Sequence, residues 1–185
     1  MRIFSGKTWV IVAGLTMGLG AAGSSAAADS QAATGNTDAL PYSSVENKQI
    51  ETFTLECSDN AQQNTLDIND CFSTKLAQIE AVNQKYVSAI RKHLEASLSD
   101  DDADHNRRKT LEAFEAEDKA WDTLIDKAST ASYQDAIGGS IRGMVAASRK
   151  LALLETRIHD QWENWLQTMS SSEPPLLPEP RFTSQ

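Results

Sequence analysis

The sequence predicts an all-α fold: an antiparallel bundle of three long helices with a disulfide-tied N-terminal segment. Apolar residues recur at steps of three or four in three long stretches, as in amphipathic helices. Short breaks separate these stretches, and short connections place consecutive helices antiparallel. Two cysteines, Cys57 and Cys71, follow an N-terminal export signal. Because exported proteins meet an oxidising environment, these two thiols are expected to form one bridge.

Residues 1–28 have the three parts of a secretory signal peptide. Arg2 and Lys7 supply the positive charge, residues 9–22 are apolar, and three alanines at 26–28 fit a cleavage site. The apolar stretch is shorter than the roughly 20 residues that a membrane-spanning helix needs. We therefore expect a periplasmic or secreted protein that has no membrane attachment after cleavage.

Residues 29–54 are assigned as a flexible leader, because the first half of this stretch is small and polar. From Ser43 onward the pattern is ambiguous. A short helix could begin at Val45, whereas the Thr-Phe-Thr sequence at 52–54 favours an extended form.

A helical domain is expected over residues 55–169, and its first helix begins near Thr65. The apolar stripe of this helix consists of Ile68, Phe72, Leu76, Ile79, Val82, Tyr86, Ile90 and Leu94. Either Asn64 or Thr65 can cap its start, and Asp67 suits the positive end of the helix dipole. Because Cys71 lies near the N-terminal end, the bridge would hold the preceding segment against the first turns.

The second and third helices follow two breaks in the pattern. An aspartate-rich stretch at 99–104 precedes the second stripe, which consists of Leu111, Phe114, Trp121, Leu124, Ile125 and Ala128. Gly138 and Gly139 are expected to end this helix, and Ser140 can cap the third, whose stripe runs from Ile141 to Met169. Residues 170–185 contain four prolines, so we expect a disordered, proline-rich tail.

The charge balance limits the classes of partner. The formal net charge is −9, and removal of residues 1–28, which hold two cations and no acid, makes it −11. Such a surface repels nucleic acids and anionic membranes, and it attracts basic proteins.

The acidic clusters do not match known metal sites or catalytic sites. Asp100, Asp101, Asp102 and Asp104 lack the glycine and the glutamate of a calcium loop, so they are interpreted as a solvated turn. Glu155 and His159 form one isolated pair at i,i+4, and no Glu-x-x-His motif of a di-iron bundle is present. We expect no cofactor, no metal and no catalytic activity.

Several short motifs occur in a defined order along the helical domain. They are Cys57, the Asn69-Asp70-Cys71-Phe72 sequence, Asn83 with Tyr86, Trp121 with Asp126, Gly138-Gly139-Ser140 and Arg157. In this order they resemble the LprI-like lysozyme-inhibitor family of exported bacterial helical proteins, over about residues 55–166. The chain departs from the family pattern at Ile125, where an arginine is usual, and at Ser129, where a cysteine is usual.

The resemblance implies a protein that binds and blocks a peptidoglycan-cleaving lysozyme. Animal-type lysozymes are basic, and an acidic partner would be steered to them. The protruding ends of the bundle would make the contact: the Asp100–Asp104 turn or the Gly138–Ser140 turn. The alternative is a non-catalytic structural or interaction module of the cell envelope. The oligomeric state does not follow from the sequence.

Overall fold

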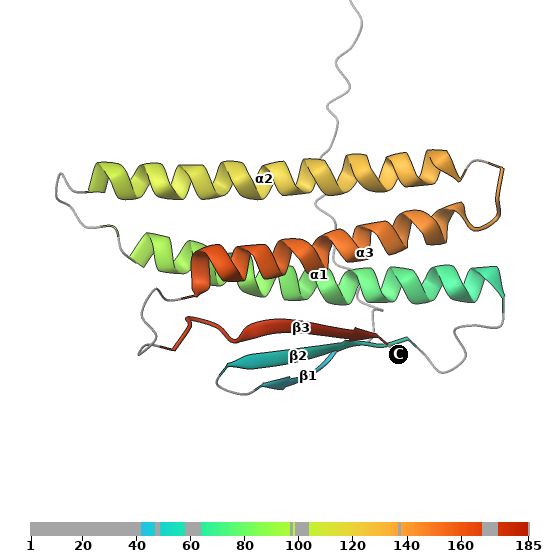
Figure 1. Ribbon diagram of the computed structural model, residues 1–185, viewed down its shortest axis with the longest axis horizontal. Coiled ribbons are helices and arrows are strands. Elements are labelled where there is room, and N and C mark those ends of the chain that lie inside the picture. The colour runs from blue at the N-terminus through green and yellow to red at the C-terminus, as the bar shows by residue number, and fades with distance from the viewer. Residues whose placement is uncertain are drawn as a thin grey trace, which may run out of the picture. The chain divides into compact units, whose positions relative to one another are not determined.

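The computed structural model describes residues 42–46, 49–57, 64–96, 98, 104–136, 138–167 and 174–184 (Figure 1). The expected signal peptide and its cleavage site lie outside these ranges. The elements are, in chain order, β1 (Ser43–Glu46), β2 (Ile50–Leu55), α1 (Thr65–Ala96), α2 (Asp104–Asp135), α3 (Arg142–Gln161), a π-helical turn η1 (Trp162–Leu166) and β3 (Glu179–Ser184). None of the helices in the described part has a stretch apolar enough to cross a bilayer.

The three expected helices are confirmed, and α3 lies between the other two. It packs against both α1 and α2, whereas α1 and α2 contact each other little (Figure 1). The core combines residues of all three helices with the inner face of β2; its largest fully buried side chains include Tyr86, Phe53, Phe114, Leu55, Ile79, Ile90, Ile158 and Leu166. Burial of this apolar surface holds the elements together.

The start of α1 follows one of the two expected capping arrangements. The Asn64 side-chain oxygen accepts hydrogen bonds from the backbone N–H groups of Leu66 and Asp67, at 2.8 and 3.1 Å. These bonds satisfy two of the donors that a helix leaves unpaired at its N-terminus. Asn64, and not Thr65, is therefore the cap.

A three-stranded sheet corrects the all-α expectation. The strand order is β1–β2–β3, with β1 antiparallel and β3 parallel to β2. The strands β1 and β2 lie in the stretch expected to be a flexible leader, so the extended alternative for 52–54 was right and a helix from Val45 was wrong. Burial alternates along β2, as it does when one face of a strand covers a core.

The C-terminal segment is also ordered where a tail was expected. β3 contains Pro180 and pairs with β2 through Glu51↔Pro180 and Phe53↔Phe182. Proline is tolerated there because β3 is an edge strand. Before the strand, the Tyr86 hydroxyl donates to the Pro178 carbonyl at 2.8 Å and Trp162 Nε1 donates to the Leu177 carbonyl at 2.9 Å. The end of the chain is thus fixed to α1 and to the end of α3.

The turn between α2 and α3 confirms the glycine prediction and corrects the cap. Gly138 has φ +90°, a conformation that favours glycine over other residues. The N-cap of α3 is Ile141, and no side chain caps the helix there. The expected cap by Ser140 is wrong, because the helix begins one residue later than the sequence suggested.

The bridge between Cys57 and Cys71 is present, with the two Cα atoms 5.1 Å apart. This separation lies in the usual range for disulfides. The bridge connects the residues that follow β2 to the second turn of α1, as expected from the position of Cys71. The two cysteines are separated by 14 positions in the sequence, so the bridge closes a short loop.

Replacing both cysteines by serine is expected to lower the free energy of unfolding by about 3 kcal/mol, because the unfolded chain regains the freedom of this loop. Urea denaturation followed by circular dichroism measures the change. The wild-type protein under reducing conditions should show a similar loss, and no loss in either sample would contradict the prediction.

Candidate functional site

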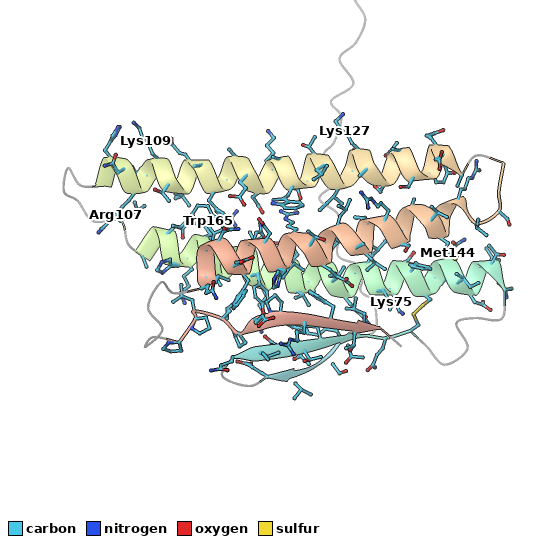
Figure 2. The ribbon with its side chains drawn as sticks, viewed as in Figure 1. Lys75, Arg107, Lys109, Lys127, Met144 and Trp165 are labelled. Atoms are coloured by element: carbon cyan, nitrogen blue, oxygen red, sulfur yellow. A yellow bond between two sulfur atoms is a disulfide. The ribbon has the colours of Figure 1, made fainter. Side chains whose placement is uncertain are left out.

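One end of the helical layer carries the disulfide, and it is called the disulfide end below (Figure 2). A Cβ placed on Gly143, in the first turn of α3, would lie 3.4 Å from the side-chain oxygen of Asn69 in α1. The Arg142 guanidinium lies over the ring of Tyr133, near the end of α2, at 4.9 Å. The start of α1, the start of α3 and the end of α2 therefore meet at this end.

Only some of the residues expected to bind a partner lie in the described part of the chain. Gly138, Gly139 and Ser140 are exposed at the disulfide end. Asp100, Asp101 and Asp102 lie outside the described residues, and Asp104 opens α2 without a described side chain. Of the two turns expected to make the contact, the Gly138–Ser140 turn is the one whose residues all lie in the described part of the chain.

Two large aliphatic side chains at the disulfide end are exposed to solvent. Leu66 in the first turn of α1 has 73 % of its surface exposed, and Ile141 at the start of α3 has 51 %. The sequence predicts Ile141 on the apolar stripe of the third helix, and no sequence signal distinguishes Leu66. Neither residue could have been identified as exposed without knowing where each helix begins.

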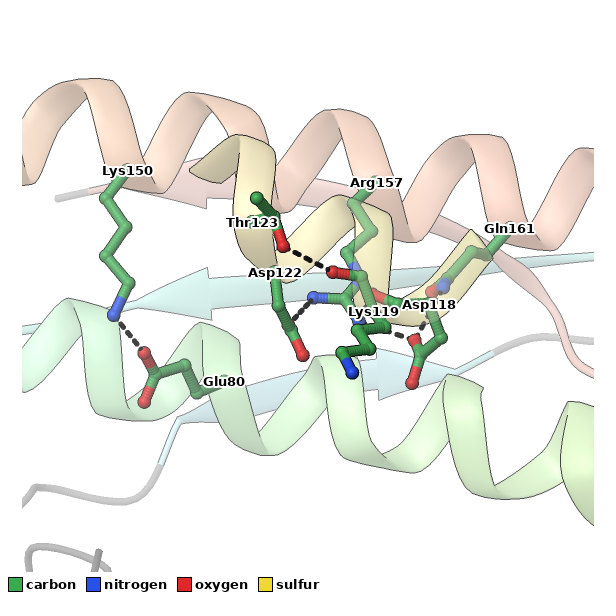
Figure 3. A network of polar contacts seen from close by, with 8 residues as sticks. All are labelled: Glu80, Asp118, Lys119, Asp122, Thr123, Lys150, Arg157 and Gln161. Atoms are coloured by element: carbon green, nitrogen blue, oxygen red, sulfur yellow. Dashed lines mark hydrogen bonds and ion pairs between the residues drawn. The ribbon is translucent and has the colours of Figure 1, made fainter. Parts of the chain in front are cut away.

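An ionic network around the buried Arg157 joins α3 to α2 (Figure 3). Arg157 is 3 % exposed, and its guanidinium pairs with the carboxylates of Asp118 and Asp122 in α2. The Asp118 carboxylate also accepts a hydrogen bond from Gln161 Nε2 at 3.1 Å. Arg157 was expected only as a family-motif residue, and its two aspartate partners were not identified. A buried charge requires such partners, so the network joins α2 to α3.

The other family-motif residues do not form one surface. Asn83 and Tyr86 are buried in α1, Trp121 is half-buried and Asp126 is exposed on α2. Within the described ranges, the buried side-chain oxygens of Asn83 and Gln161 and the buried Nε of Arg157 have no hydrogen-bond partner. Most of these motif residues therefore serve the interior rather than a contact surface.

The pKa values of one buried group, Tyr86, and two half-buried groups, Glu117 and Glu155, lie above their ordinary range. Burial, with a smaller contribution from the Glu51 charge, raises the pKa of the Tyr86 hydroxyl, so this group stays a hydrogen-bond donor. Burial also raises the pKa of Glu155. It raises the pKa of Glu117, although a hydrogen bond from Trp165 Nε1 opposes the shift.

His159, the histidine of the isolated Glu155–His159 pair, is exposed, and its ring packs against Trp162 with the ring centroids 5.8 Å apart. Throughout the described ranges, no three histidine, cysteine or carboxylate side chains are grouped as metal ligands would be. The disulfide end has an exposed surface that a partner could contact, whereas the Arg157 network stabilises the packing of α2 against α3.

Comparison with known proteins identifies one match. A family model described as Lysozyme inhibitor LprI matches residues 57–160, which is more than half of the chain. The match begins at the first cysteine of the disulfide and ends within α3, so it includes the three helices but not the strands. No curated protein and no solved structure matches the chain.

Proposed function

The chain belongs to the LprI lysozyme-inhibitor family, and from this we propose that it binds and blocks a peptidoglycan-cleaving lysozyme outside the cytoplasm. The family match over residues 57–160 is the observation that carries the proposal. The inhibitor acts by contact, since a blocked cleft needs no chemical step from the blocking protein. Export through the N-terminal signal peptide brings it to the compartment where such enzymes attack the cell wall.

The acidic charge supports a basic lysozyme as the partner. The net charge of the chain is −9, and it becomes −11 once residues 1–28 are removed. Opposite charges raise the rate of encounter, and this steering weakens with salt. Inhibition should therefore need less protein at low ionic strength than at high ionic strength.

The direction of the helices decides which ends can protrude toward the partner. We infer that α1 and α3 run parallel to each other and antiparallel to α2. The inference is supported by the pairs Glu80–Lys150 and Asn69–Gly143 between α1 and α3, and by Asp118–Arg157 and Tyr133–Arg142 between α2 and α3. In this arrangement the α2–α3 turn and the start of α1 form one end of the protein.

A lysis assay tests the proposal. Purified protein without residues 1–28 is added to a basic animal-type lysozyme, and the loss of turbidity of a bacterial cell suspension is followed. The rate of lysis is expected to fall in proportion to the added protein until the inhibitor reaches about the enzyme's concentration. An unrelated protein of similar negative charge is the control for non-specific attraction. Unchanged lysis at a large molar excess would contradict the proposal and favour an envelope interaction module.

A further inference from the structure

We propose that an apolar tip at the disulfide end, formed by Leu66, Gly138, Gly139 and Ile141, occupies the substrate cleft of the lysozyme. This inference rests on the proposed function and assigns the surface that carries it out. The tip combines exposed aliphatic side chains with a glycine turn, and it comes from two helices that are distant in sequence.

The exposure of the tip has no explanation in the fold itself. Leu66 and Ile141 are two of the five exposed large hydrophobic residues in the described part of the chain. Ile141 also occupies the N-cap of α3, where serine, threonine, asparagine or aspartate would stabilise the helix. An exposed residue that is less stabilising than the residue types usual at its position is typical of a functional surface.

The tip has a shape that fits a concave site. A Cβ placed on Gly138 would meet no atom within 4 Å, so its outer side is open. Gly138 and Gly139 therefore present backbone without side chains next to Ile141. Substrate clefts are concave, so a projecting turn that carries few large side chains can enter one.

The tip is also held rigidly. The disulfide fixes the residues after β2 to the second turn of α1, close behind Leu66. The close approach between Asn69 and Gly143 holds the start of α1 against the start of α3. A surface that is ordered before binding loses less conformational freedom when the complex forms.

Acidic side chains flank the tip. The described residues within 56–70 and 135–142 contain four acids (Glu56, Asp67, Asp70 and Asp135) and one cation, Arg142, a net charge of −3. A basic partner is attracted to such a surface. The connection between α1 and α2 is also rich in aspartate, so the choice of the disulfide end rests on the exposed aliphatic side chains of Leu66 and Ile141.

Two substitutions test the tip without weakening the fold. In the double variant Leu66→Gln with Ile141→Asn, glutamine keeps the helix propensity of α1 and asparagine is a better cap than isoleucine. The variant should fold with a melting temperature equal to or above that of the wild type. In the lysis assay it should need about tenfold more protein for half-inhibition, as expected when interface anchors are lost.

The matched control is Leu124→Gln, which makes the same chemical change on α2. Leu124 is 50 % exposed and lies outside the tip, so its replacement should leave half-inhibition unchanged. A soluble trimer of N-acetylglucosamine is added as a second probe. Because it binds in the substrate cleft, it should raise the amount of wild-type protein needed to bind the enzyme.

The outcomes separate this inference from the proposed function. If the wild type inhibits and the folded double variant inhibits equally well, the tip does not make the contact and the inference is wrong while the function stands. If the wild type inhibits but the sugar trimer does not compete, the tip does not occupy the cleft. If the wild type fails to inhibit any basic lysozyme tested, both proposals fall together.

Discussion

Replacing Arg157 by methionine is expected to lower the free energy of unfolding by about 3 kcal/mol, since a partly buried carboxylate loses its counter-charge. Arg157 is 3 % exposed and pairs with Asp118, which is 18 % exposed, and with Asp122 at 2.7 Å. Methionine fills similar space but carries no charge. Within the described residues, the Asp118 carboxylate would then keep the hydrogen bond from the Gln161 amide and lose its contact with the guanidinium. Urea denaturation followed by circular dichroism and tryptophan fluorescence measures the loss.

An exposed ion pair provides the control for Arg157. Lys150 pairs with Glu80 between α3 and α1, and the side chains are 35 % and 49 % exposed. The change Lys150→Met removes one cation from the same helix, but solvent already screens this pair, so it should cost less than about 1 kcal/mol. Equal losses in the two variants would show that burial of the Arg157 network contributes nothing to stability.

Replacing Phe53 by alanine is expected to cost about 3–5 kcal/mol, because a large cavity would form between the sheet and α1. Phe53 is fully buried in β2. Its ring stacks on Phe182 of β3 at 5.6 Å and meets Tyr42 and Tyr86 edge-on at 5.5 and 6.2 Å. Losing this ring removes contacts to Tyr42, which precedes β1, to Phe182 in β3 and to Tyr86 in α1.

The cost at Phe53 tests whether the sheet is part of the cooperative fold. The same unfolding experiment on Val45→Ala is the comparison, because Val45 lies in β1 and is 76 % exposed. That change should cost less than about 0.5 kcal/mol, as surface substitutions usually do. A Phe53→Ala protein as stable as Val45→Ala would mean that the helices fold independently of the strands.

The helices could be predicted because their signals are local. An apolar stripe, a cap and a break lie within one stretch of sequence, and Asn64 and the two glycines at 138–139 acted as expected. The position of the third cap was missed because a shift of one residue moves the cap from Ser140 to Ile141. Such boundaries depend on how the helix packs, which the sequence does not state.

The sheet could not be predicted because its pairing is distant in sequence. β2 and β3 pair through Phe53↔Phe182, and the four prolines before and within β3 indicated a tail rather than a strand. All four residues of β1 are exposed, so it lacks the alternation that marks a strand. Only the Thr-Phe-Thr sequence of β2 indicated an extended form.

The candidate site could be predicted only in part. The Gly138–Ser140 turn was identified from its glycines, whereas the start of α1 is brought to the same end by the close approach of Asn69 to Gly143. The Arg157 network was equally hidden, because Asp118 and Asp122 are two of many acids on the second helix. The residues of the site and of the network can be distinguished from the many similar residues in the sequence only once the contacts between the helices are known.

Hydrogen–deuterium exchange of the protein, with and without an excess of a basic lysozyme, tests the central claim most directly. If the disulfide end is the contact surface, amide exchange should slow in residues 64–72 and 138–146 and stay unchanged in residues 104–112. Protection confined to residues 104–112, or no protection anywhere in the chain, would contradict the account.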